Sequence, residues 1–170
     1  MPAVVTACPD QLQLDVPTKG PVPPPSAESL AYSLTLPAGL ASPAVARQAA
    51  KAILRAHDLL DVTDAAAQVL GELTACACRF TPTAEVYVSL RYRDGALRVI
   101  VYDGHPRHTN PRLAANCDTR HRAALRVLAC VVRACGGEWG FGDARQPGGG
   151  TRMWAVLPRQ GARGYGQPPG

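Results

Sequence analysis

Alternating apolar and polar residues along the chain predict a set of short strands. These strands are expected over residues 32–36, 85–93 and 96–102, around Trp139, and over residues 151–157. Asp94-Gly95 separates the second strand from the third, and this pair favours a tight hairpin turn. The glycine run at 148–150 favours another turn before the last strand. The pattern therefore predicts a mixed, mostly antiparallel sheet.

Apolar residues at helical spacing predict a first helix after the opening strand. It is expected to begin with Ser42 as the N-cap and Pro43 at the first helical position, where proline is favoured. Its apolar face is expected to hold Val45, Ala49, Ile53 and Leu54.

Two further helices are expected from the same spacing. The second begins near Asp61 or Thr63, and its apolar stripe is expected to hold Ala66, Val69, Leu70, Leu73 and Ala77. A polar loop then extends to about Asp118, and a third helix covers roughly residues 120–134. Gly136-Gly137 is expected to end this third helix.

This order of elements predicts the fold class. Strand, helix, helix, hairpin, loop, helix and two strands form an α/β (α+β) two-layer sandwich, with helices packed on one face of the sheet. Proline-rich residues 1–28 and glycine-rich residues 159–170 are expected to be disordered tails. The folded domain is therefore expected over residues 29–158.

Composition narrows the classes of function. Of the 170 residues, 46% are hydrophobic, which is enough for a core, yet no apolar run approaches the ~20 residues of a membrane span. The net charge is +5, but the arginines are dispersed and aromatic residues are few, so we expect no nucleic-acid partner. The first residues lack the pattern of a signal peptide, and we expect a cytoplasmic protein without membrane contact.

The cysteines and histidines raise the possibility of a metal site. Cys117 and His121 have helical i, i+4 spacing, and His105 and His108 lie a few residues upstream, so a zinc site is conceivable. However, six cysteines in a cytoplasmic chain more often serve as buried thiols. We therefore expect no metal site, and a zinc- or thiol-based sensor remains an alternative.

Four stretches of the sequence carry a resemblance to a known family. They are LTLPAGLASPAVARQAAKAIL, GELTACACRF, VIVYDGHP and GGGTRMWAVLP. In their order and spacing, over about residues 30–158, they resemble the Bergerat-type ATP-binding fold of the GHKL (histidine kinase-like) group. Within that group the chain is most similar to the anti-sigma-factor serine/threonine kinase-like ATP-binding proteins of actinobacteria.

The resemblance implies roles for two residues of the second helix. Glu72 stands at the position of the catalytic acid, which activates the attacking group. Cys76 stands one turn later, where the family has an asparagine that holds Mg²⁺, and a thiol is a poor ligand for this hard cation.

The resemblance also implies a nucleotide-reading part. Asp103 would read the adenine amino group, Gly104 would let the backbone approach the ring, and Thr151 would lie beside the aspartate. The glycine-rich phosphate loop of the family is absent, and Arg122, with Arg120, would partly replace its contacts as point charges.

The function implied by the resemblance is that of an ATP-binding regulator in transcription, using ATP and Mg²⁺. Its partner would be a sigma factor or an anti-sigma-factor antagonist, and an active protein would be a serine/threonine kinase. A homodimer is left open. The alternative is a degenerate pseudo-ATPase that serves as a protein-interaction module without turnover.

Overall fold

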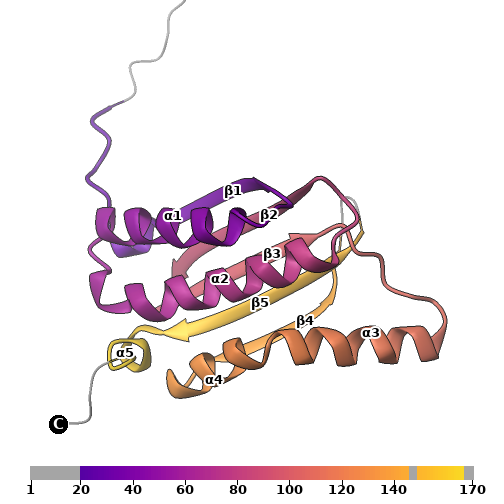
Figure 1. The fold of residues 1–170 in the computed structure, drawn as a ribbon. Coiled ribbons are helices and arrows are strands. Elements are labelled where there is room, and N and C mark those ends of the chain that lie inside the picture. The colour runs from indigo at the N-terminus through magenta and orange to yellow at the C-terminus, as the bar shows by residue number, and fades with distance from the viewer. Residues whose placement is uncertain (1–19, 146–148, 167–170) are drawn as a thin grey trace, which may run out of the picture.

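The computed structural model describes residues 20–145 and 149–166, which form two layers. Figure 1 shows the helices on one face of a single sheet, with the opposite face of the sheet uncovered. The five strands lie in the order β1-β2-β3-β5-β4, and every described strand pair is antiparallel. The strands are β1 (Ala31–Pro37), β2 (Glu85–Arg93), β3 (Ala96–Asp103), β4 (Glu138–Asp143) and β5 (Thr151–Pro158).

Five α-helices and two short 3-10 turns complete the described part of the chain. The α-helices are α1 (Ser42–Ala56), α2 (Thr63–Phe80), α3 (Pro111–Ala124), α4 (Arg126–Ala134) and α5 (Arg159–Ala162), and the 3-10 turns are η1 (Ala27–Ser29) and η2 (Leu60–Val62). α2 lies centrally, against α1, α4, β2, β3 and β5. Among these described elements, no helix is both long and apolar enough to cross a bilayer.

The predicted two-layer α+β fold class, with helices on one face of the sheet, is confirmed. All five predicted strands form, each within about one residue of its expected position, and the predicted stripe of α2 is buried. The sheet differs from the prediction in being antiparallel throughout its described strands rather than mixed.

The predicted apolar face of α1 is wrong in part. Val45 is 51% exposed, whereas Ala46 and Ala50 are buried. The buried face is therefore rotated by about one residue relative to the prediction, and small alanines allow α1 to pack closely against α2. Ser42 is not the N-cap: it lies inside the helix, where it is buried and its hydroxyl donates to the carbonyl of Pro37.

The predicted polar loop up to Asp118 is wrong over most of its length. The chain is already helical from Pro111, because the Asn110 side chain caps α3 by accepting from the backbone N–H groups of Arg112 and Leu113. The single helix expected over 120–134 is in fact the end of α3 followed by α4, with Leu125 between them.

The ends of the predicted domain also differ from expectation. Residues 159–162 form α5 rather than a disordered tail, with Ala162 buried. Arg159 donates from Nε to Asp61 Oδ2 at 2.9 Å, which fastens α5 to η2. Gly148 of the predicted glycine turn, and residues 1–19 of the predicted N-terminal tail, lie outside the described residues.

Candidate functional site

Asp103 is the buried acid at the end of β3. Val99, Val101 and Asp103 alternate along the strand and are buried, so the carboxylate faces the helices. The side chain of Asp103 is 5% exposed; its Oδ1 accepts from the backbone N–H of His105 at 2.9 Å, and its Oδ2 is buried without a hydrogen-bond partner. A carboxylate oxygen in this state has unused capacity to accept a donor.

The pKa of the Asp103 carboxyl is raised above its usual value. Burial is the largest cause, because it penalises the charged form. The backbone N–H of His105 and the charge of His121 act in the opposite direction but do not compensate for it. Perturbed titrating groups of this kind are enriched at functional sites.

Thr151 and Gly104 fix the chain around Asp103. Thr151 is the β5 partner of Asp103 in the ladder, and its hydroxyl donates to the carbonyl of His105 at 3.0 Å. The N–H of Gly104 donates to Oγ1 of Thr81 at 3.0 Å, and a Cβ at Gly104 would collide with the side chain of Thr83. In this structure the glycine therefore makes room for Thr83.

Cys76 lies inside α2, near both predicted acids. Cys76 is 3% exposed, and burial raises the pKa of its thiol to about 12, with a further contribution from the charge of Asp103. Glu72 contributes in the same direction, so its charge also reaches the Cys76 thiol. The neutral thiol offers no oxygen ligand and no negative charge for Mg²⁺.

Glu72 lies one turn before Cys76 and is half-buried. It accepts a hydrogen bond from Gln68 Nε2 at 2.9 Å, an i, i+4 contact within α2. A cavity of 410 Å³ includes Asp103 in its lining, but Glu72 is not among its lining residues. Its other lining residues include Thr35, Tyr87 and Tyr102, which lie on the uncovered face of the sheet.

Three rings from distant parts of the chain stack on the helical side, next to Asp103. His121 of α3 lies 4.3 Å from the ring of Phe80, the last residue of α2, and 5.5 Å from the ring of Phe141 of β4. His121 is 1% exposed, and its ring centroid lies 5.7 Å from that of His105, whose backbone N–H donates to Asp103 Oδ1. We call these three residues the ring stack. It fills space on the side of the sheet where Asp103 points.

Arg122 does not lie in a phosphate cradle. It is exposed on α3, and its guanidinium lies 5.6 Å from the centroid of the Phe141 ring in a cation–π contact. Arg120 is also exposed and lines a separate cavity of 140 Å³. The two arginines that were expected to replace the phosphate loop are therefore surface residues of a helix.

The residues do not fit the Mg²⁺-assisted chemistry of the family pattern. The position expected to hold the metal is a buried, protonated thiol, and the segment expected to cradle phosphates is helical. Asp103, which was expected to read the nucleotide, keeps one buried oxygen, Oδ2, without a hydrogen-bond partner among the described residues.

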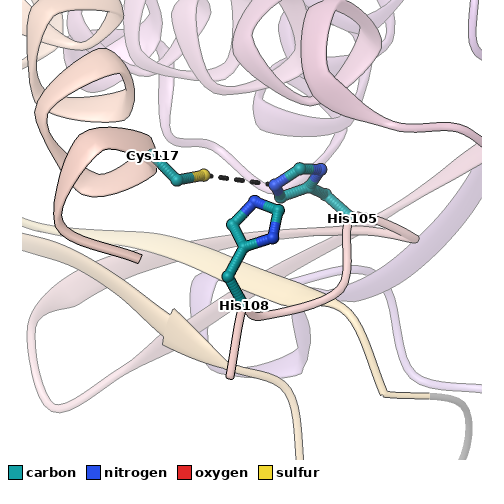
Figure 2. Close-up of side chains that lie close together, drawn as sticks. All are labelled: His105, His108 and Cys117. Atoms are coloured by element: carbon teal, nitrogen blue, oxygen red, sulfur yellow. Dashed lines mark hydrogen bonds between the residues drawn. The ribbon is translucent and has the colours of Figure 1, made fainter. Parts of the chain in front are cut away.

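The structure brings together three of the four residues named for a zinc site. Figure 2 shows His105, His108 and Cys117 close together, with the thiol and the imidazole of His105 in hydrogen-bond contact. His121 lies beside this group rather than in it: its Nδ1 donates to the carbonyl of Cys117 at 3.0 Å and lies 3.5 Å from the Cys117 thiol, while its ring belongs to the ring stack.

Sequence reasoning did not identify Phe80, Phe141, Thr81 or Thr83 as site residues. Phe80 is the last residue of the GELTACACRF stretch and Phe141 lies on a short glycine-flanked strand, but the resemblance assigns a role to neither. The N-cap pattern Asn110-Pro111 was a signal that could have predicted α3 and therefore the position of His121.

Comparisons with known proteins reveal a distant likeness in fold. No protein-family model matches the sequence, and no curated protein matches it. Among solved structures, the chain is similar to the histidine kinase domain from the Erythrobacter litoralis EL346 blue-light activated histidine kinase, at 20% sequence identity and a TM-score of 0.44. The match covers 75% of this chain and 64% of that chain, so this chain spans less than two thirds of the kinase structure.

Proposed function

We propose that this chain is a regulatory protein of the anti-sigma-factor kinase type that has lost ATP turnover and acts by binding a protein partner. The partner is a sigma factor or an anti-sigma-factor antagonist. The proposal rests on one observation above all: the ring stack of Phe80, His121 and Phe141 lies beside His105 and Asp103, on the helical side of the sheet, where the resemblance implies that an adenine would be read.

The metal position supports the same conclusion. Phosphoryl transfer depends on charge neutralisation by a bound metal ion, and one electrostatic contact of this kind is typically worth about 2.7–4 kcal/mol in the transition state. The buried Cys76 offers only a soft sulfur donor, which does not suit Mg²⁺. Turnover should therefore be absent even if a nucleotide enters.

The uncovered face of the sheet offers a surface for a partner. Tyr87, Tyr102 and Trp154 are exposed or half-buried there, together with exposed Arg98 and Arg152. Aromatic residues and arginine are the types enriched at protein interfaces. The arginines favour a partner with an acidic docking surface.

Calorimetric titration with ATP tests the loss of nucleotide function. We expect no saturable heat at high micromolar ATP with Mg²⁺, and no ADP release over hours. Saturable, Mg²⁺-dependent binding that disappears in Asp103→Asn but persists in Asp94→Asn would contradict the proposal. Asp94 is a suitable control because it is 84% exposed in the β2–β3 turn, distant in the ladder from Asp103.

One observation favours the second candidate, an ATP-binding serine/threonine kinase with Glu72 as the base. The unpartnered Oδ2 of Asp103 could accept the adenine amino group if the ring stack opened. In that case Cys76→Asn should strengthen Mg²⁺-dependent ATP binding, because it restores an oxygen ligand. Under the first proposal this variant leaves ATP binding undetectable.

Binding to a partner is tested on the uncovered face. We expect Arg152→Glu to weaken the affinity for the cognate sigma factor or antagonist at least tenfold, measured by biolayer interferometry. Arg126→Glu on α4, also exposed but on the helical layer, is the matched control. Equal loss in both variants would show that the effect is one of net charge and not of this face.

A further inference from the structure

The segment between β3 and α3 gathers metal-binding side chains at one point. His105 and His108 come from this segment and Cys117 from the middle of α3, and their nearest nitrogen and sulfur atoms all lie within 4.8 Å of one another. The Nε2 of His105 lies 3.1 Å from the Sγ of Cys117. Figure 2 shows the thiol pointing from the helix toward the two imidazole rings.

We propose that His105, His108 and Cys117 bind a zinc ion. Two imidazoles and a thiolate form a borderline-soft donor set that suits Zn²⁺ and does not suit Mg²⁺ or Ca²⁺. The site is separate from the proposed partner surface and does not depend on nucleotide binding. It uses residues that the ATP-fold pattern leaves without a role.

The spacing of the donor atoms fits this assignment. With Zn–N bonds of about 2.0–2.1 Å and Zn–S bonds of about 2.3 Å, tetrahedral ligands lie about 3.3–3.6 Å apart. Since the donor atoms lie within 4.8 Å of one another, the most widely separated pair has to approach by at most about 1.2–1.5 Å, and exposed His108 is free to make this movement. Three protein ligands leave one position for water, and the adjoining 140 Å³ cavity, lined by the same three residues, has room for it.

Hydrogen bonds around the ligands hold the site in place. The peptide groups on either side of His105 are fixed, since its N–H donates to Asp103 Oδ1 and its carbonyl accepts from Thr151. Arg107 forms ion pairs with Asp118 of α3 and, at 2.9 Å, with Asp143 of β4. These contacts fix the chain that carries the ligands, and His121 Nδ1, 3.5 Å from Cys117 Sγ, is an outer contact of the kind that orients a metal ligand.

Zinc at this position would fasten the segment 104–110 to α3. The backbone of His105 is hydrogen-bonded to Asp103, and its ring lies against His121 of the ring stack. A bound ion would therefore hold the segment 104–110 in place over the carboxylate and the ring stack. An ion that binds the folded arrangement and not the unfolded chain stabilises the fold by mass action. The site is therefore a structural clamp with one water-accessible position.

Cobalt substitution in the full chain tests the site. The protein is first freed of metal by dialysis against a chelator under reducing conditions and then titrated with Co²⁺ alone. We expect one equivalent to produce a thiolate-to-cobalt charge-transfer band with the visible bands of tetrahedral cobalt, and one equivalent of Zn²⁺ to abolish both. No band at stoichiometric Co²⁺, together with no heat on titration with Zn²⁺, would overturn the proposal.

Variants assign the band to these residues. Cys117→Ser should remove the charge-transfer band, and His108→Ala should weaken Zn²⁺ binding at least tenfold, the lower limit for loss of even an outer contact. Cys130→Ser is the matched control, since Cys130 is an exposed thiol on the neighbouring helix. A band that persists in Cys117→Ser, or one that is lost in Cys130→Ser, would contradict the assignment. Circular dichroism of each variant shows whether it is folded, and His108, being exposed, is not needed for packing.

Discussion

Two aspartates at opposite ends of the β3–β5 ladder have opposite surroundings. Asp61 lies at the end where β5 runs into α5, and its Oδ2 accepts from Arg159 at 2.9 Å and from Arg163 at 2.8 Å. Asp103 lies at the other end, buried, with one backbone N–H donor and no arginine in contact. Each carboxylate also has one buried oxygen without a partner, so the difference lies in the cations.

The pKa values follow this difference. Hydrogen bonds to Arg159 are the main cause that lowers the pKa of Asp61, whereas burial raises the pKa of Asp103. The ionised carboxylate of Asp61 therefore stabilises the fold, whereas the ionised carboxylate of Asp103 lowers the free energy of unfolding. A costly polar group inside a packed layer is typical of a site kept, or inherited, for function rather than for folding.

The largest expected effect comes from removing the charge of Asp103. We expect Asp103→Asn to raise the free energy of unfolding at pH 7 by about 1–2 kcal/mol, because a neutral amide keeps an acceptor for His105 N–H and is cheaper to bury than a carboxylate. Urea unfolding monitored by circular dichroism measures the change. A loss of stability would mean that the carboxylate has a cation partner in solution.

A smaller effect of opposite sign is expected at Asp61. Asp61→Asn should lower the free energy of unfolding by about 1 kcal/mol, because it removes two partly buried ion pairs. Arg159→Gln alone and the double variant complete a mutant cycle. If the two single effects add, the ion pair contributes nothing and the comparison between the two aspartates fails.

The smallest expected effect is the change with pH in the contribution of Asp61 to the free energy of unfolding. Since the pKa of Asp61 is lowered in the folded state, its contribution is fully present above the unfolded value of about 3.9 and is lost as pH falls through the folded value. The stability difference between the native protein and Asp61→Asn should therefore be constant from pH 7 to 5 and shrink below about pH 4. A difference that already shrinks between pH 7 and 5 would assign the effect to another group.

The local pattern of apolar and polar residues was sufficient to predict much of the sheet and the buried face of α2. Alternation located β2 and β3, Asp94-Gly95 located their turn, and the period of Val69, Leu70 and Leu73 gave the buried face of α2. These features depend on neighbours in sequence, and their pattern records directly which side of an element is buried.

The apolar pattern of the sequence gave wrong predictions where small or polar residues make the contacts that place a helix. Alanines rather than Val45 face the core from α1, and α3 begins at Pro111 because of a cap rather than an apolar period. α5 forms after β5 because Arg159 reaches Asp61, a partner 98 positions away in sequence. Contacts of this kind leave little trace in the local order of apolar residues.

The sequence by itself determined the layer order, the burial of α2 and the position of Asp103 at the end of a core strand, because hydrophobic period and turn residues act locally. Only the tertiary structure decided that Phe80, His121 and Phe141 stack beside that carboxylate, and that His105 and His108 meet Cys117. These groups are assembled by packing of α3 against α2 and β4, and the energy of such packing belongs to residues far apart along the chain.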